Sequence, residues 1–64
     1  MTDEEILALR NHRFPRGRVT VHHIGSGKVY FVSKLDGRSD WFPWWMRREL
    51  FEEAVDREGS RVAR

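Results

Sequence analysis

Two runs of β-branched and aromatic residues, separated by three small residues, constrain the fold of this chain more than any other feature. The runs cover residues 18–24 and 28–35, and Gly25-Ser26-Gly27 stands between them. Side chains of this kind favour extended backbone, and glycine favours the tight connection that reverses a chain. We therefore predict an antiparallel hairpin at the centre of the protein.

A second turn signal extends this hairpin to a third strand. Asp36-Gly37 is typical of a two-residue type I′ turn, and residues 38–42 follow it. Counting outward from that turn pairs Phe31 with Phe42. The sequence thus predicts an α+β protein whose sheet is a three-stranded antiparallel meander over residues 18–42, either open or curled into a small open barrel. The alternative is a fold in which the aromatic segment forms a fourth barrel strand.

The expected sheet has apolar side chains on both faces. The alternation of strand side chains places Val29 and Phe31 on one face and Tyr30 on the other, and either plausible register of the first hairpin adds Val19 and Val21 to the Tyr30 face. An antiparallel sheet normally needs only one covered face. The second face must then be closed by barrel curvature, by the N-terminal helix or by a partner, which includes a second copy in a homodimer.

A short N-terminal helix is expected over residues 1–10. Thr2 or Asp3 can cap it, and two glutamates that suit the positive end of a helix dipole follow. The connection over residues 10–18 breaks this helix and is rich in arginine.

An amphipathic C-terminal helix is expected over residues 43–58. Pro43 suits the first turn of a helix, and Gly59 suits the position after its end. Trp44 lies seven residues before Phe51, so both are expected on the apolar side of this helix. Residues 59–64 are expected to form a frayed tail.

The segment from Trp41 to Trp45 contains all three tryptophans of the chain. A domain of 64 residues buries only about 60% of its unfolded surface, so some of these rings must face water or a partner. Trp45 and Trp41 are the rings that we expect to be exposed, whereas Phe42, Trp44 and Phe51 are expected in the core.

Composition points to a single domain over residues 1–64 without a covalent or metal staple. The chain has no cysteine, which excludes disulfides and thiolate zinc sites. The acidic residues after Met1 do not fit a signal peptide, and no apolar run approaches the 18 residues of a membrane span. We expect a cytoplasmic protein that does not contact membranes.

No motif for catalysis or cofactor binding is found. Gly25-Ser26-Gly27-Lys28 lacks the spacing of a phosphate-binding loop. His22 and His23 are adjacent on a strand and therefore point to opposite faces, which disfavours a shared metal. We expect no enzymatic activity, no cofactor and no metal.

Charge is distributed unevenly along the chain. Residues 10–48 carry nine Lys and Arg against two Asp, a net charge of +7, whereas residues 1–9 and 49–64 carry net charges of −3 and −2. A basic centre beside exposed aromatic rings favours an anionic partner. The basic side chains are expected to surround Tyr30, Trp41 and Trp45.

The leading hypothesis is therefore a non-enzymatic module that binds DNA or RNA. Its candidate contacts are Arg13, Arg16, Arg18, Lys28, Lys34, Arg38, Trp41, Arg47 and Arg48. The alternative is a module that binds a host or phage protein and inhibits or redirects it, with the aromatic segment as the contact surface. Its candidate contacts are Trp41, Trp44 and Trp45.

Two resemblances to known families accompany these residues. The spacing of residues 19–24, 27–31 and 41–43 resembles small phage and prophage accessory proteins with an SH3-like barrel, which implies a phage or mobile-element origin. The order of three strands and a helix, with Gly37-Arg38 in a turn, is similar to AP2 and integrase arm-binding domains. Those domains lay a sheet into the major groove of DNA, and the likeness implies DNA contacts by Arg18, Lys28, Lys34, Arg38 and Trp41. The element order also matches double-stranded-RNA-binding domains, although the lysine-rich start of their last helix is missing here.

Overall fold

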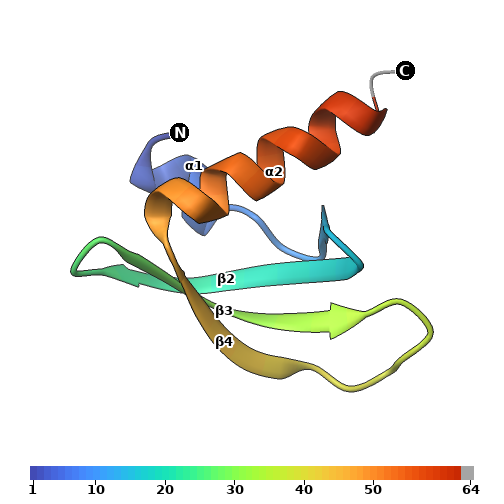
Figure 1. Ribbon diagram of the computed structural model, residues 1–64. Coiled ribbons are helices and arrows are strands. Elements are labelled where there is room, and N and C mark those ends of the chain that lie inside the picture. The colour runs from blue at the N-terminus through green and yellow to red at the C-terminus, as the bar shows by residue number, and fades with distance from the viewer. Residues whose placement is uncertain (63–64) are drawn as a thin grey trace.

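A four-stranded antiparallel sheet carries two helices on one of its sides (Figure 1). The computed structural model describes residues 1–62, with side chains through residue 58. The elements are α1 (Asp3–Leu7), β1 (His12–Phe14), β2 (Gly17–Gly25), β3 (Lys28–Leu35), β4 (Phe42–Arg47) and α2 (Arg48–Val62). Strands pair in sequence order, so β1 and β4 are the two edges of an open sheet. The α+β class is confirmed, but the prediction of three strands is wrong.

The central hairpin is confirmed, and its turn is tighter than expected. Gly25 pairs with Lys28, so Ser26 and Gly27 alone form the turn. Their φ angles are 53° and 71°, and positive values at both positions are what a type I′ turn requires.

A register shift in β2 changes which residues share a face. The shift lies between Val21 and His23, and it pairs Val21 with Phe31. Val19 and Val21 are consequently buried in the core beside Phe31. The prediction that these valines share the face of Tyr30 is wrong, because a one-residue irregularity moves a strand's side chains to the other face.

The additional strand, β1, was expected to be part of a loop. Pro15 and Arg16 make a two-residue turn that pairs Phe14 with Gly17. Proline pre-sets the backbone for the first position of such a turn. Phe14 then lies in the core, and its burial holds the short strand against β2.

The last strand covers Phe42–Arg47 rather than residues 38–42. The amide of Arg38 donates to the carbonyl of Leu35 at 3.0 Å, and Gly37 has a φ of 81° whereas Asp36 does not have positive φ. This is not the type I′ turn expected, and residues 36–41 form a loop. Phe31 accordingly pairs with Trp44 instead of Phe42.

The C-terminal helix begins at Arg48, five residues after the predicted start, and it continues past Gly59 to Val62. Pro43 lies in β4 instead of a helix. Proline has no backbone N–H, and it is tolerated in an edge strand at positions whose N–H would point to the open edge and need no strand partner. Part of the predicted tail is thus helical, and residues 63–64 lie outside the described residues.

The N-terminal helix is shorter than predicted, but its cap is confirmed. The hydroxyl of Thr2 accepts from the Glu5 amide at 3.2 Å, and the Glu5 carboxylate accepts from the Thr2 amide at 2.7 Å. This reciprocal pair is a capping box. The hydrogen bond from Thr2 holds the pKa of the Glu5 carboxyl below its ordinary value.

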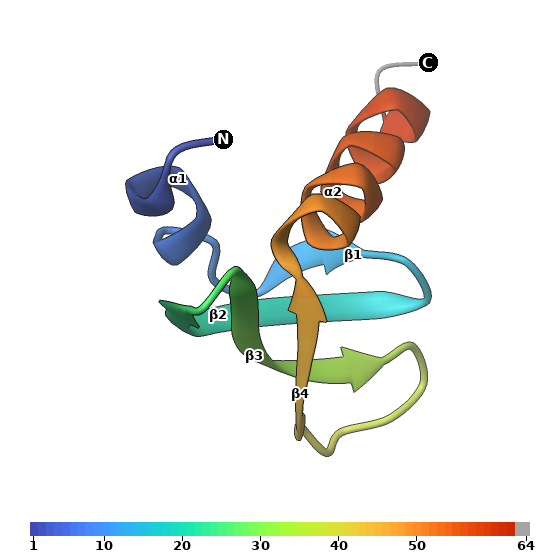
Figure 2. The ribbon, with the colours of Figure 1, turned by 60° about the vertical axis from the view of Figure 1, so that its left-hand side comes forward.

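The core lies between the sheet and the two helices. Three rings meet at its centre: Phe14, Phe31 and Phe51 have pairwise centroid distances of 5.3–5.7 Å. The other buried apolar residues are Ile6, Val19, Val21, Val29 and Val55. Helix α2 contacts β1, β3 and β4, so it spans the opening between the two edge strands (Figure 2).

Candidate functional site

The sheet face opposite the core is basic along its length. We call it the outer face, and its strand register assigns to it the cations Arg13, Arg18, Lys28, Lys34 and Arg47. None of the four strands contains Asp or Glu. The acidic residues of the described chain instead lie in the helices and in the loop after β3.

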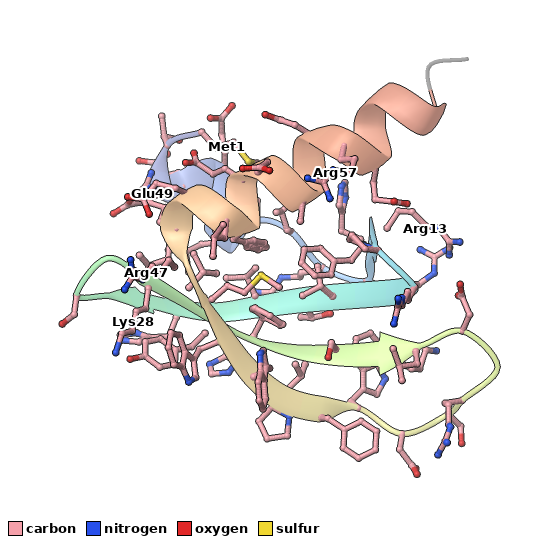
Figure 3. All side chains as sticks on the ribbon, viewed as in Figure 1. Met1, Arg13, Lys28, Arg47, Glu49 and Arg57 are labelled. Carbon is pink, nitrogen blue, oxygen red and sulfur yellow. The ribbon has the colours of Figure 1, made fainter. Side chains whose placement is uncertain are left out.

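Like charges occupy opposing positions on this face. Lys28 pairs with Arg47 across β3 and β4, and Arg18 pairs with Lys34 across β2 and β3. Figure 3 shows Lys28 and Arg47 at the same end of the sheet, with Arg13 at the other end. Opposite charges on facing strands stabilise a sheet, and like charges there destabilise it. Folding alone therefore does not favour this arrangement.

Two lysines lie over tryptophan rings on the outer face. The Lys28 ammonium is 4.6 Å from the ring centroid of Trp45, and the Lys34 ammonium is 5.2 Å from that of Trp41. Trp45 is 46% exposed and Trp41 is 37% exposed, which confirms the expected exposure. An exposed cation–π contact contributes about 0.5–1 kcal/mol, whereas stacking of a nucleobase contributes about 1–3 kcal/mol. A base can therefore displace the ammonium from its ring.

A further aromatic side chain lies between these two pairs. Tyr30 is the cross-strand partner of both Trp45 and His23, and its ring centroid is 5.4 Å from that of His23. The six residue-to-residue steps from Lys28 to Lys34 correspond to roughly 20 Å of strand. Over that length the outer face of β3 presents Lys28, Tyr30, Val32 and Lys34, so a cation lies at each end with a ring between them.

The structure brings together only some of the predicted nucleic-acid contacts. Arg18, Lys28, Lys34, Arg47 and Trp41 lie on or beside the outer face. His23 also lies on this face and was not among the predicted contacts. Counting outward from the two-residue turn at Ser26-Gly27 pairs His23 with Tyr30, so the sequence does contain a signal for it.

The remaining predicted cations have other positions. Arg13 lies at the end of the outer face and bonds the Asp36 carboxylate, with Nη1 to Oδ1 at 3.3 Å. Arg16 is in the β1–β2 turn and Arg38 in the loop after β3, both exposed. Arg16 and Arg38 therefore border the outer face, whereas Arg13 belongs to it but is paired with Asp36.

Arg48 is held in a structural role. Its guanidinium pairs with the Asp3 carboxylate and donates to the Met1 carbonyl at 2.6 Å. The Met1 ammonium in turn pairs with Glu52 at 2.7 Å. These contacts join α1 to the first turns of α2, so Arg48 is not available to the outer face.

A second exposed surface, the apolar strip, runs along the other side of β4. It consists of Phe42, Trp44 and Met46 from β4 with Leu50 from α2; Trp44 is 64% exposed and Leu50 is 56% exposed. Met46 and Leu50 border a groove of about 380 Å³ that also contacts Phe14 and Ala54. The expectation that Phe42 and Trp44 are buried is wrong, because α2 leaves β4 at Arg48 and runs toward β1 (Figure 2).

The described part of the chain has neither a cluster of metal-binding side chains nor a membrane-spanning helix. Within residues 1–62, no three His, Asp or Glu side chains gather in a way that could hold a metal ion. None of the helices in this range is long and apolar enough to cross a membrane.

Comparison of the chain with known proteins found no matching family model, no significantly similar curated sequence and no significantly similar solved structure.

Proposed function

We propose that the protein is a non-enzymatic module that binds nucleic acid through its outer face. The observation that carries this proposal is the opposition of like charges in strands that contain no carboxylate. Such pairs oppose folding unless a polyanion neutralises them. A phosphate backbone supplies negative charges at a regular spacing, and it releases counterions when cations bind it.

Each kind of side chain has a separate role in the proposed complex. Arg47 offers a guanidinium group that can bind phosphate in a bidentate manner. Arg18, whose Nη1 donates to the Asn11 carbonyl at 2.8 Å, offers its remaining N–H groups. Lys28 and Lys34 act as point charges beside the rings, and Trp41 and Trp45 offer flat apolar surfaces for bases. The roles are sequence-independent, so binding is expected to tolerate many sequences.

The experiment is a titration of a fluorescein-labelled mixed-sequence oligonucleotide, followed by anisotropy at several salt concentrations. Both the single strand and its duplex are tested. If four cations contact phosphates, the logarithm of the association constant falls against the logarithm of salt with a slope of about −3 on a single strand. Arg47→Gln should make that slope less steep by about 0.7.

The matched control is Arg57→Gln. It removes the same charge from α2, where Arg57 pairs with Glu53 at 2.9 Å, and it should leave the salt slope unchanged. Absence of binding to either form of the oligonucleotide at low salt would refute the proposal.

A second candidate function is protein binding through the apolar strip. Its specific support is Trp44, which is 64% exposed and lies two residues before Met46, a lining residue of the apolar groove, on the same face of β4. Exposed tryptophans next to apolar pockets are common anchors of protein interfaces. A second copy of the chain is one such partner, and sedimentation equilibrium tests it directly.

The two candidates respond to different substitutions. Trp44→Glu should abolish a protein complex or a dimer and leave the oligonucleotide affinity nearly unchanged. Arg47→Gln should do the reverse. A Trp44→Glu protein that loses oligonucleotide binding and remains folded would show that the assignment of surfaces is wrong.

A further inference from the structure

We infer that the outer face takes single-stranded nucleic acid in preference to duplex, an inference that rests on the function proposed above. The rings are the side chains that can distinguish the two forms, because the cations attract both. In a duplex the flat faces of the bases are covered by their neighbours. Only unpaired bases can be spread over a sheet and stacked on protein side chains.

The rings are arranged for this purpose. Trp45 and Trp41 each lie under a lysine, near opposite ends of the segment from Lys28 to Lys34. Tyr30 lies beside Trp45 on the same face. When a base stacks on a ring, the displaced ammonium stays close enough to contact the adjoining phosphate. Each ring can thus contact the base of one nucleotide while its lysine contacts the adjoining phosphate.

The free edge of β4 adds hydrogen-bond donors beside one ring. The amide of Arg48 donates to the carbonyl of Gly27 at 3.0 Å, which sets the alternation of backbone groups along β4. The N–H groups of Trp45 and Arg47 therefore point away from β3, toward the open edge. An unpaired base on the Trp45 ring can reach them with the edge that pairing would occupy in a duplex.

The cations, the rings and the free amides together determine how strongly the outer face should prefer a single strand to a duplex. The cations contribute to both forms, whereas the rings and the free amides contribute only to the single strand. We expect the single strand to bind at least tenfold more tightly than the duplex of the same sequence at the same salt. The probe is a mixed-sequence oligonucleotide of about 20 nucleotides without self-complementarity, used alone and annealed to its complement.

The decisive variants are Trp45→Ala and Trp44→Ala. They remove the same side chain from neighbouring positions of β4, one on the outer face and the other on the apolar strip. Trp45→Ala should lower the single-strand affinity about 5- to 100-fold and change the duplex affinity by less than twofold. Trp44→Ala should change neither. Circular dichroism and a urea titration establish that both variants are folded.

The outcomes separate this inference from the proposed function. Equal affinity for both forms, or an equal loss in both for Trp45→Ala, would overturn the single-strand preference while leaving nucleic-acid binding intact. Binding to neither form would overturn both. If Trp45→Phe restores single-strand affinity toward the original value, the flat ring itself is the source of the preference. If it behaves like Trp45→Ala, stacking is not the cause.

Discussion

Lys28 and Arg47 lie opposite each other on β3 and β4, at the end of the sheet nearest the central hairpin turn. The Lys28 ammonium is turned onto the ring of Trp45, 4.6 Å from its centroid. The Lys28–Arg47 pair thus places two positive charges beside an exposed aromatic ring, which belongs to the nearby Tyr30–Trp45 pair. Repulsion between the two charges lowers the stability of the fold, whereas the same side chains offer a binding site. Stability and binding affinity can therefore be compared in one variant.

Arg47→Glu should raise stability and weaken nucleic-acid binding in the same variant. Glutamate at position 47 faces Lys28 and replaces a repulsive cross-strand pair with an attractive one, worth about 0.2–1 kcal/mol. The same change places a carboxylate on the proposed phosphate-binding face, so oligonucleotide affinity should fall at least tenfold. Urea unfolding and fluorescence anisotropy measure the two effects.

Arg57→Glu is the control for this charge reversal. It alters net charge by the same amount but lies on α2, where it breaks the pair with Glu53. It should slightly lower stability and affect affinity far less than Arg47→Glu. If Arg47→Glu lowers both stability and affinity, Arg47 supports the fold and the like-charge argument fails.

Local signals explain why the central hairpin could be predicted from the sequence. Ser26 and Gly27 adopt the positive φ angles of a type I′ turn, and the flanking residues have high strand propensity. The capping box at Thr2 and Glu5 is equally local. Interactions within a few residues of each other determine these features.

Long-range pairing determines the features that could not be predicted. Pro43 suits a helix start by local criteria, and only the pairing of β4 with β3 makes it an edge-strand residue. Strand β1 is three residues long, too short to stand out, and the burial of Phe14 against Phe31 and Phe51 stabilises it.

Register errors affected the two predicted hairpins differently. The error between β3 and β4 was two residues, since Phe31 pairs with Trp44 instead of Phe42. A shift of two preserves the face, so the basic and aromatic residues of the outer face could still be grouped. The irregularity after Val21 is a shift of one, and it reversed the predicted face of that valine.

Gly17→Ala should unfold most of the protein. A Cβ atom at Gly17 would lie 1.9 Å from the Lys34 carbonyl oxygen and 2.9 Å from the Leu35 Cα. Both are backbone atoms of the paired strand and cannot move without disrupting the sheet. Overpacking of this kind costs about 1–3 kcal/mol or more, comparable to the stability of so small a domain. Far-ultraviolet circular dichroism measures the loss.

Gly25→Ala is the matched control for the substitution at Gly17. Its Cβ would meet the His23 Nε2 atom at 3.0 Å, and that flexible side chain can rotate away. This variant should remain folded. Equal stability of the two alanine variants would show that the close approach of β2 and β3 at Gly17 is not a constraint.

Arg16→Gly should stabilise the protein by about 1 kcal/mol, since a left-handed conformation costs other L-residues roughly 1–2 kcal/mol. Arg16 has a φ of 68° in the turn between β1 and β2. Arg16→Ala removes the same charge and keeps the Cβ atom, so its stability should stay near that of the original protein. Urea unfolding compares the two variants. If glycine is no more stable than alanine, the turn is not strained.

Alkaline pH should destabilise the protein through the contact of Met1 with Glu52. The Glu52 carboxylate accepts a hydrogen bond from the Met1 ammonium at 2.7 Å. This contact raises the pKa of the Met1 ammonium above its ordinary 8.0. A group whose pKa is raised on folding stabilises fully below its unfolded pKa, and this contribution is lost as pH rises through its folded pKa. The thermal unfolding midpoint should therefore decrease as the pH rises above 8. Glu52→Gln should remove this decrease in midpoint, whereas the control Glu53→Gln should retain it. A decrease of the same size in both variants would assign the alkaline loss of stability to another group.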